Sequence, residues 1–179
     1  MVFPMSNESL AMNSAVVNES QEDMEDALPE LPDLPISPHP NYVTPSGLAQ
    51  LRERLSAVDE RRNALEAAGP SGAEEAAQAR RELRWLQARV SSAIVLASDQ
   101  QATDRVAFGA SVEAVDQHDH HHRYRIVGED QADPEHGLVS WVSPLARALE
   151  GARVGDVVVW KRPAGDLEIE VLSVDYAGP

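Results

Sequence analysis

Two stretches of heptad-spaced apolar residues, separated by a short turn, constrain the fold of this chain more than any other feature. The first stretch has apolar residues at Leu48, Leu51, Leu55, Val58 and Leu65. The second continues in regular steps of three and four residues at Ala76, Ala79, Leu83, Leu86, Val90, Ala93 and Ala97. Such spacing places the apolar side chains on one face of a helix. The intervening Gly69-Pro70-Ser71-Gly72 ends a helix and reverses the chain.

The two stretches therefore predict an antiparallel coiled-coil hairpin over residues 44–99. Thr44-Pro45 marks its start, because threonine caps helices and proline suits the first helical position. Arms of roughly 24 residues would each be about 36 Å long at 1.5 Å per residue. Two helices of an ordinary bundle are the alternative, but no third helical pattern is present to complete one.

The apolar period changes after Asp99 to short segments rich in β-branched and aromatic residues. Five strands are predicted: Val106–Val115, Arg123–Val127, Leu138–Val142, Val157–Trp160 and Leu167–Val174. Val157–Trp160 is predicted to be a buried strand. Ser143-Pro144 should open one short helix over Leu145–Leu149. Residues 100–179 are thus predicted to form an antiparallel β domain with one covering helix, which makes the chain an α+β protein.

The N-terminal segment, residues 1–43, holds eight acidic residues, no Lys or Arg, and six of the 12 prolines. This composition predicts a disordered acidic tail, extended in its proline-rich part. The chain as a whole has a net charge of −15, which disfavours binding to duplex DNA. Basic protein surfaces or cations are the expected partners. A tail that docks on a basic partner is possible, although a solvated tail is the preferred interpretation.

Cysteine is absent, which excludes disulfides, thiol catalysis and Cys-ligated zinc. The N-terminus lacks the basic start and apolar core of a secretory signal, and no apolar run reaches the ~20 residues of a membrane span. We therefore expect a cytoplasmic protein with no membrane association.

The C-terminal half contains a series of short motifs over residues 108–176: Phe108-Gly109-Ala110-Ser111-Val112-Glu113, Tyr124-Arg125-Ile126-Val127-Gly128, Ser143-Pro144-Leu145-Ala146-Arg147-Ala148-Leu149, Val154-Gly155-Asp156-Val157, Pro163-Ala164-Gly165 and Val174-Asp175-Tyr176. In order and spacing, this series resembles the GreA/GreB family of bacterial transcription elongation factors, and GreB more than GreA. The Ser-Pro-x-Ala-Arg-Ala-Leu segment followed by Val-Gly-Asp is the most specific part. Tyr42–Leu48 resembles the family's entry into its coiled coil. The resemblance implies an FKBP-like fold for residues 100–179.

The same resemblance implies a function. In the family, the C-terminal domain holds the rim of the secondary channel of RNA polymerase, and the coiled coil enters the channel. Acidic residues at its tip help to position a metal ion and water that cleave backtracked RNA, a role that suits carboxylates. The expected polymerase-binding residues here are Ser143, Pro144, Ala146, Arg147 and Leu149. Arg147 can either contact the polymerase or anchor its own helix. A monomer without a cofactor or an active site of its own is implied.

The tip departs from the family pattern, which reads Gly-Asp-x-x-Glu-Asn. Pro70 stands at the aspartate position and Ala73 at the glutamate position, while Glu74 and Glu75 follow one residue late. Ser71 and Glu74 have the spacing of a capping box, so helix capping is the preferred interpretation of Glu74. Each arm is also about one heptad shorter than the family's, roughly 10–12 Å of reach. We therefore expect docking with weak or no stimulation of transcript cleavage.

Three further interpretations compete with this one. His118, His120 and His122 are weak candidates for binding Zn²⁺ or Ni²⁺, although a polar loop is preferred. The regulator of nucleoside diphosphate kinase, a binding protein outside transcription, resembles this architecture but has a reduced hairpin; the present hairpin is intermediate in length, and the C-terminal motifs favour the elongation factors. A prolyl isomerase would need an aromatic-lined pocket, which only Phe108, Tyr124, Trp141, Trp160 and Tyr176 could supply.

Overall fold

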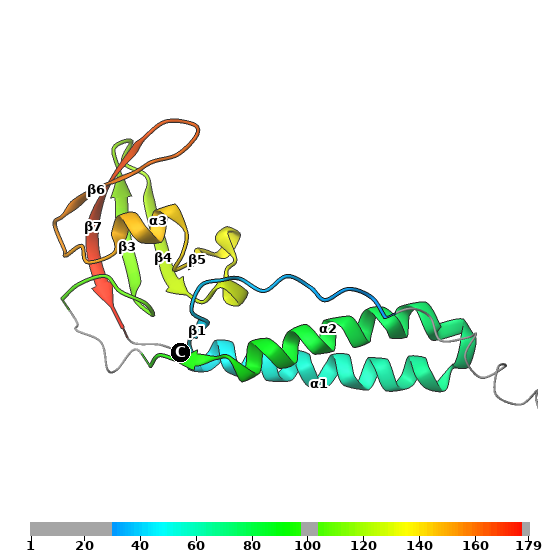
Figure 1. Ribbon diagram of the computed structural model, residues 1–179. Helices are drawn as coiled ribbons and strands as arrows, with labels where there is room; N and C mark the ends of the chain where they lie inside the picture. Colours follow the sequence, from blue (N-terminus) through cyan, green and yellow to red (C-terminus); the bar gives the residue numbers. More distant parts are fainter. Residues whose placement is uncertain (1–29, 98–103, 177–179) are drawn as a thin grey trace, which may run out of the picture. The chain divides into compact units, whose positions relative to one another are not determined.

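The computed structural model describes residues 30–97 and 104–176 (Figure 1). A helical hairpin comes first and is formed by α1 (Pro45–Ala67) and α2 (Ala73–Ser91). A five-stranded sheet with one short helix follows. The predicted α+β class, with the hairpin ahead of the β domain, is confirmed. The acidic residues 1–29 of the predicted tail lie outside the described residues.

The heptad stripes form the contact between the two helices of the hairpin. Their buried members are Leu51, Val58, Ala76, Ala79, Leu83 and Leu86, and Val43 joins the same cluster. Thr44 caps α1 as predicted, since its hydroxyl accepts a hydrogen bond from the Gly47 N–H at 3.0 Å. Arg61 and Glu82 form an ion pair between the two helices at 3.0 Å. Exposed pairs of this kind contribute little, so the apolar contact holds the hairpin.

The second helix ends earlier than its heptad pattern predicts. α2 stops at Ser91, and the Ser92 hydroxyl donates to the Ala88 carbonyl at 2.8 Å. The chain then forms β2 (Ile94–Val95), so Ala93 and Ala97 are not helical. Two serines that can bond the backbone, followed by two β-branched residues, favour this change from helix to strand.

Part of the predicted tail is an ordered segment at the base of the hairpin. Tyr42 and Val43 form β1, which pairs in parallel with β2. Asn41 and Val43 are buried. The predicted tail of residues 1–43 therefore includes a strand, β1, at its C-terminal end.

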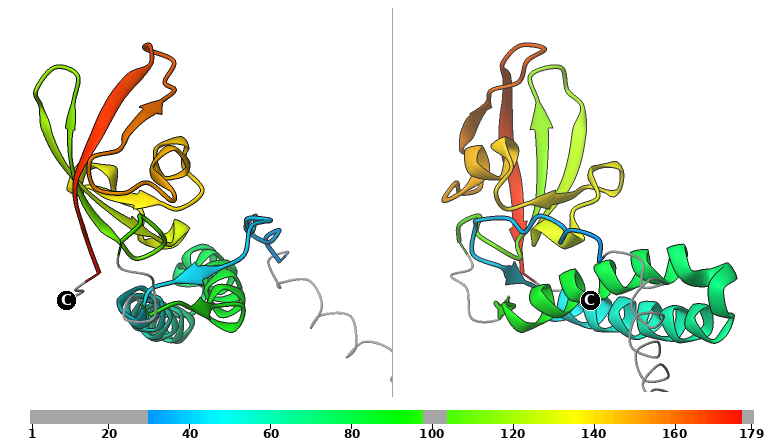
Figure 2. Two further views of the ribbon diagram at one scale, coloured as in Figure 1. Left: turned by 90° about the vertical axis from the view of Figure 1, so that its left-hand side faces the viewer. Right: turned by 45° about the vertical axis from the view of Figure 1, so that its right-hand side comes forward.

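The β domain is one mixed sheet in the order β5-β4-β3-β7-β6 (Figure 2). Its strands are β3 (Ser111–Asp116), β4 (His121–Val127), β5 (Leu138–Ser140), β6 (Val157–Trp160) and β7 (Leu167–Asp175). Three of the pairings are antiparallel, but β4 and β5 are parallel. The prediction of an all-antiparallel sheet was wrong here, because two short 3₁₀ turns between β4 and β5 reverse the chain direction twice: Glu129–Gln131 and Pro134–His136.

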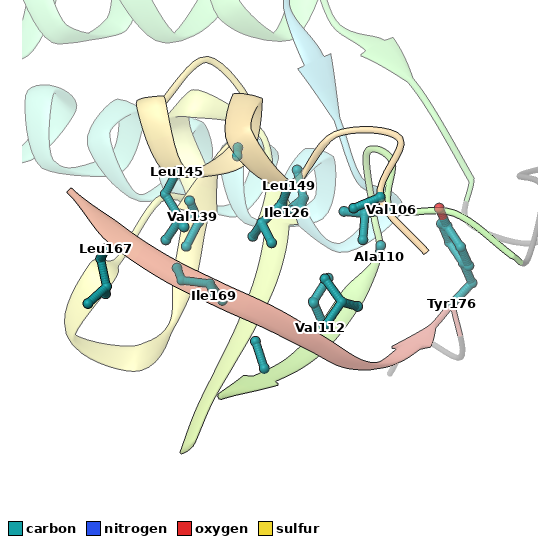
Figure 3. Packing of buried hydrophobic residues seen from close by; sticks show 14 residues of the cluster. Val106, Ala110, Val112, Ile126, Val139, Leu145, Leu149, Leu167, Ile169 and Tyr176 are labelled. Atoms are coloured by element: carbon teal, nitrogen blue, oxygen red, sulfur yellow. The ribbon is translucent and has the colours of Figure 1, made fainter. Parts of the chain in front are cut away.

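One helix, α3 (Pro144–Leu149), packs against the core of the β domain. Its Leu145 and Leu149 pack against Val112, Ile126 and Ile169 (Figure 3).

The strand predicted over Val106–Val115 is shorter than expected. Gly109 adopts a φ of +86° and turns the chain before β3 begins.

Within residues 30–97 and 104–176, no helix combines the length and the hydropathy that crossing a bilayer requires.

The hairpin depends on its small apolar contact, which can be tested by truncating Leu86. This side chain is 0% exposed, so Leu86→Ala should reduce the free energy of unfolding by about 2–5 kcal/mol. Urea unfolding followed by far-UV circular dichroism measures the change. Gln87→Ala, on the exposed face of the same helix, is the control and should stay within about 0.5 kcal/mol of the parent. Equal losses for both variants would contradict this packing.

Candidate functional site

The predicted docking residues on α3 divide into buried and exposed groups. Ala146 and Leu149 are 3% and 0% exposed and belong to the core of the β domain. Ser143 caps the helix, and its hydroxyl accepts from the Ala146 N–H at 3.1 Å. Pro144 and Arg147 are exposed. A partner can therefore touch the side chains of Pro144 and Arg147, while the others hold the helix in place.

Arg147 does not anchor its own helix. Its guanidinium has no ion-pair or hydrogen-bond partner among the described residues, and it stands on the exposed side of α3. An unpaired guanidinium can bind a carboxylate or a carbonyl of another protein. Of the two roles predicted for Arg147, the geometry favours contact with a partner.

The neighbouring edge of the sheet exposes apolar side chains that the sequence did not mark. β6 was predicted to be buried, but within residues 30–97 and 104–176 it is an edge strand whose one neighbour is β7. Val157 and Val159 are 59% and 46% exposed, and Val154 just before the strand is also exposed. The prediction failed because four consecutive apolar residues cannot show which strands lie at an edge. Exposed apolar residues of this kind are typical of a protein-binding surface.

The tip of the hairpin is a single 3₁₀ turn, Gly69–Gly72, between the two helices. Gly69 has a φ of +71°, the left-handed conformation that ends many helices. A side chain at Gly72 would meet the Leu65 carbonyl at 2.5 Å, so only glycine allows this close approach. The turn exposes Pro70 and leaves Ala73 partly buried. Neither side chain offers a ligand to a metal ion.

The predicted capping box at the tip does not form. The Ser71 hydroxyl donates to the Ala68 carbonyl at 3.1 Å, and no side chain caps α2. Glu74 and Glu75 are exposed in the first turn of α2 and have no partner within the described part of the chain. Their position suits the helix dipole. Helix capping was therefore the wrong interpretation of Glu74.

A buried polar network joins the hairpin to the chain around it. Arg89 of α2 is 2% exposed, and its guanidinium donates to Asp130 Oδ2 and to Asn41 Oδ1, both at 2.7 Å. The Asn41 amide in turn donates to the Arg89 carbonyl at 2.7 Å. The sequence did not predict this network. Arg89 lies beside the apolar stripe of α2, and its partners Asn41 and Asp130 are far from it in the sequence and belong to no recognisable motif.

The His-rich segment forms the turn between β3 and β4 around one buried carboxylate. Asp116 Oδ1 accepts from the His118 and His120 backbone N–H groups at 2.8 and 3.1 Å. Its Oδ2 lies 3.3 Å from His120 Nδ1 and 3.1 Å from His122 Nε2. The His118 ring instead lies beside Gln117. The three predicted metal candidates thus do not converge, and no metal-binding trio of side chains is present among the described residues.

Asp116 is held in its ionised form by these contacts. Burial alone would raise the pKa of Asp116. Hydrogen bonds from the His122 ring, from the two backbone N–H groups and from the His120 ring outweigh it, and hold the pKa well below its ordinary value of 3.8. The segment is a structured turn that depends on its carboxylate.

The aromatic residues of the β domain do not form one pocket. Phe108 and Trp141 both pack against Tyr42 of β1, with ring centroids 6.0 and 4.9 Å away. Tyr124 stacks on His122, and the Tyr176 hydroxyl donates to the Arg105 carbonyl. The arrangement gives no support to a prolyl isomerase site.

Comparison with known proteins supplies the family. The model of the C-terminal domain of the transcription elongation factors GreA/GreB matches residues 100–176. Transcription elongation factor GreB of Neisseria meningitidis serogroup B (strain ATCC BAA-335 / MC58) is 36% identical over 153 residues, covering 76% of this chain and 94% of GreB. The chain belongs to the GreA/GreB family.

Other GreA/GreB proteins match a smaller part of this chain. Transcription elongation factor GreA of Yersinia pestis bv. Antiqua (strain Angola) is 41% identical over 96 residues, which cover 52% of this chain and 61% of that protein.

Solved structures of similar proteins include the GreA factor homolog Gfh1 of Thermus thermophilus, 24% identical with a TM-score of 0.37. It covers 76% of this chain and 99% of its own. A GreA/GreB factor from Nitrosomonas europaea is 18% identical, with a TM-score of 0.38 and coverage of 75% and 98%. At these scores the family assignment rests on the sequence matches alone.

This GreA/GreB protein should lose stability in acid through Asp116. A carboxylate whose pKa is lowered by folding stabilises fully above its unfolded value of 3.8, and this contribution is lost as the pH falls towards the folded value. Asp116→Asn should therefore be less stable than the parent at pH 7, and the difference should shrink below about pH 4. Urea unfolding between pH 3 and 7 measures it, with the exposed Asp166→Asn as control. A difference that does not change with pH would contradict this account.

Proposed function

We propose that this protein binds bacterial RNA polymerase at the rim of its secondary channel and regulates elongation with weak or no stimulation of transcript cleavage. Family membership supports the polymerase as partner. The geometry of the hairpin tip carries the second half of the proposal. The protein would act in the cytoplasm, as a monomer, and without catalysing a reaction of its own.

The tip lacks the chemistry that cleavage requires. Hydrolysis of a phosphodiester by Mg²⁺ needs oxygen ligands that hold the ion and orient water. Pro70 and Ala73 occupy the two positions where the family carries carboxylates, and neither has an oxygen to offer. Glu74 and Glu75 are exposed, but they belong to the first turn of α2 and follow the turn that forms the tip. Their displacement supports docking without efficient cleavage.

The hairpin is also short. α1 has 23 residues and α2 has 19, which gives lengths of roughly 35 and 29 Å at 1.5 Å per residue. These lengths agree with the short arms that the sequence predicts, and they support a hairpin with less reach.

Docking is assigned to the exposed part of α3 and the adjacent β6 edge. Arg147 offers a guanidinium without a partner among the described residues, and Val157 and Val159 offer apolar surface. Interfaces commonly combine an arginine with such an apolar patch. A role as a regulator of nucleoside diphosphate kinase has less support, since the similar proteins are named as transcription elongation factors.

Replacement of Arg147 tests the docking surface. Arg147→Ala should weaken binding to purified RNA polymerase by about tenfold, because a hydrogen bond to a charged group contributes roughly 1.5–3 kcal/mol. Arg123→Ala is the matched control, since Arg123 lies on β4 and pairs with Glu113. Binding is measured by biolayer interferometry. Equal affinity of Arg147→Ala and the parent would rule out Arg147 as a contact.

An RNA-cleavage assay on backtracked polymerase complexes tests the missing chemistry. The parent protein should bind these complexes but leave cleavage near the rate without factor, whereas a cleavage-active GreA/GreB factor serves as the positive control. The double variant Pro70→Asp/Ala73→Glu restores the family carboxylates and should remain weak, because the reach of the hairpin is unchanged. Cleavage by the parent at the rate of the positive control would refute the proposal.

A further inference from the structure

An extended segment, residues 31–40, runs beside α2 ahead of β1 (Figure 1). It contains four prolines, at positions 32, 35, 38 and 40, and forms neither helix nor strand. The proline rings fix φ near −65°, so the segment has little conformational freedom to lose on binding. We call residues 31–40 the strap.

Two adjacent side chains of α2 hold the strap. The Arg84 guanidinium donates to Asp33 Oδ1 and to the Leu31 carbonyl, both at 2.7 Å. The Trp85 indole N–H donates to the Pro35 carbonyl at 3.2 Å. An extended proline-rich chain makes no internal hydrogen bonds, so its carbonyls are available to such donors. The Arg84 guanidinium therefore binds a carboxylate and a carbonyl of the strap, and the Trp85 indole binds a second carbonyl.

Two guanidinium groups lie over the Trp85 ring. The guanidinium carbons of Arg54 and Arg89 lie 5.7 and 6.0 Å from its ring centroid. Arg89 is itself fixed by the buried network with Asp130 and Asn41. Cation–π contacts stabilise the ring in the orientation that directs its N–H to Pro35. The site is thus built into the hairpin rather than formed by the strap alone.

The far end of the strap contacts the β domain. The Ser37 hydroxyl donates to Glu129 Oε1 at 3.0 Å, in the 3₁₀ turn that follows β4. His39 packs edge-on against Trp141, with ring centroids 6.1 Å apart. The strap therefore makes polar contacts with α2 through one half and with the β domain through the other.

We propose that Arg84 and Trp85 form a binding site for an extended, proline-rich acidic segment, and that the strap of the same chain occupies it. The occupied site braces the hairpin against the β domain. The preset backbone of the strap, its Asp33 and its continuity with β1 at Tyr42 favour the chain's own segment over any other ligand.

Indole N–H exchange in the full-length protein tests occupancy of the site. The chain has three tryptophans, and Trp160 serves as an internal control. Replacement of Pro32, Pro35 and Pro38 by glycine should free the strap and speed hydrogen exchange of the Trp85 indole about fivefold, the effect of losing one net hydrogen bond. The Trp160 signal should not change. A synthetic peptide of residues 30–41 added to this variant should slow the exchange again.

Two results would overturn this assignment. Equal Trp85 exchange in the parent and the glycine variant would show that the strap does not occupy the site. Protection that rises with protein concentration would show that the occupant comes from a second copy of the chain.

Distance measurements between spin labels test the brace. Because the chain has no cysteine, Ser56→Cys on α1 and Glu150→Cys after α3 can be labelled selectively. The distance distribution should be broader in the glycine variant than in the parent. Equal widths would overturn the bracing role.

Discussion

The contacts of the described helices and strands depend on the hydrogen bonds that the buried guanidinium of Arg89 makes to Asp130 and Asn41. A charge that is 2% exposed is tolerated only when it is paired and hydrogen-bonded, and Asp130 and Asn41 provide both. Those partners lie on different segments, one after β4 and one just before β1. The network therefore ties α2, the base of the hairpin and the β domain together at one point. Trp85 rests against the same guanidinium, which links the strap to this point.

The sequence predicted those features that follow from local periodicity. Both apolar stripes, the Thr44 and Ser143 caps and the five strands of the β domain could be located, because heptads, capping residues and β-branched runs are local signals. The short strands β1 and β2 were not predicted. Features decided by tertiary position could not. The apolar run around Val157 predicts a buried strand, but the strand lies at the edge of the sheet and Val157 is exposed. The spacing of Ser71 predicts a helix cap, but its hydroxyl donates to the Ala68 carbonyl in the preceding turn. The docking residues proposed on α3 were chosen by motif, but only the structure separates Arg147 at the surface from Leu149 in the core.

Family membership and tip geometry lead to different conclusions about function. The GreA/GreB motifs lie mostly in the β domain, which retains its core, its capped α3 and an exposed edge. The tip keeps the turn but not the carboxylates at positions 70 and 73, and the helices leading to it are 23 and 19 residues long. A domain suited to binding thus carries a hairpin poorly suited to catalytic assistance. Under the proposed function, such a protein would compete with cleavage factors for the polymerase.

The central claim is that the hairpin enters the polymerase channel without reaching the catalytic metal. Because the chain has no cysteine, Ser71→Cys at the tip can carry a tethered iron chelate that generates hydroxyl radicals locally. With the labelled protein bound to RNA polymerase, the account predicts cuts in the walls of the secondary channel and none at the active centre. Cuts at the active centre, or no cuts in the channel, would contradict it.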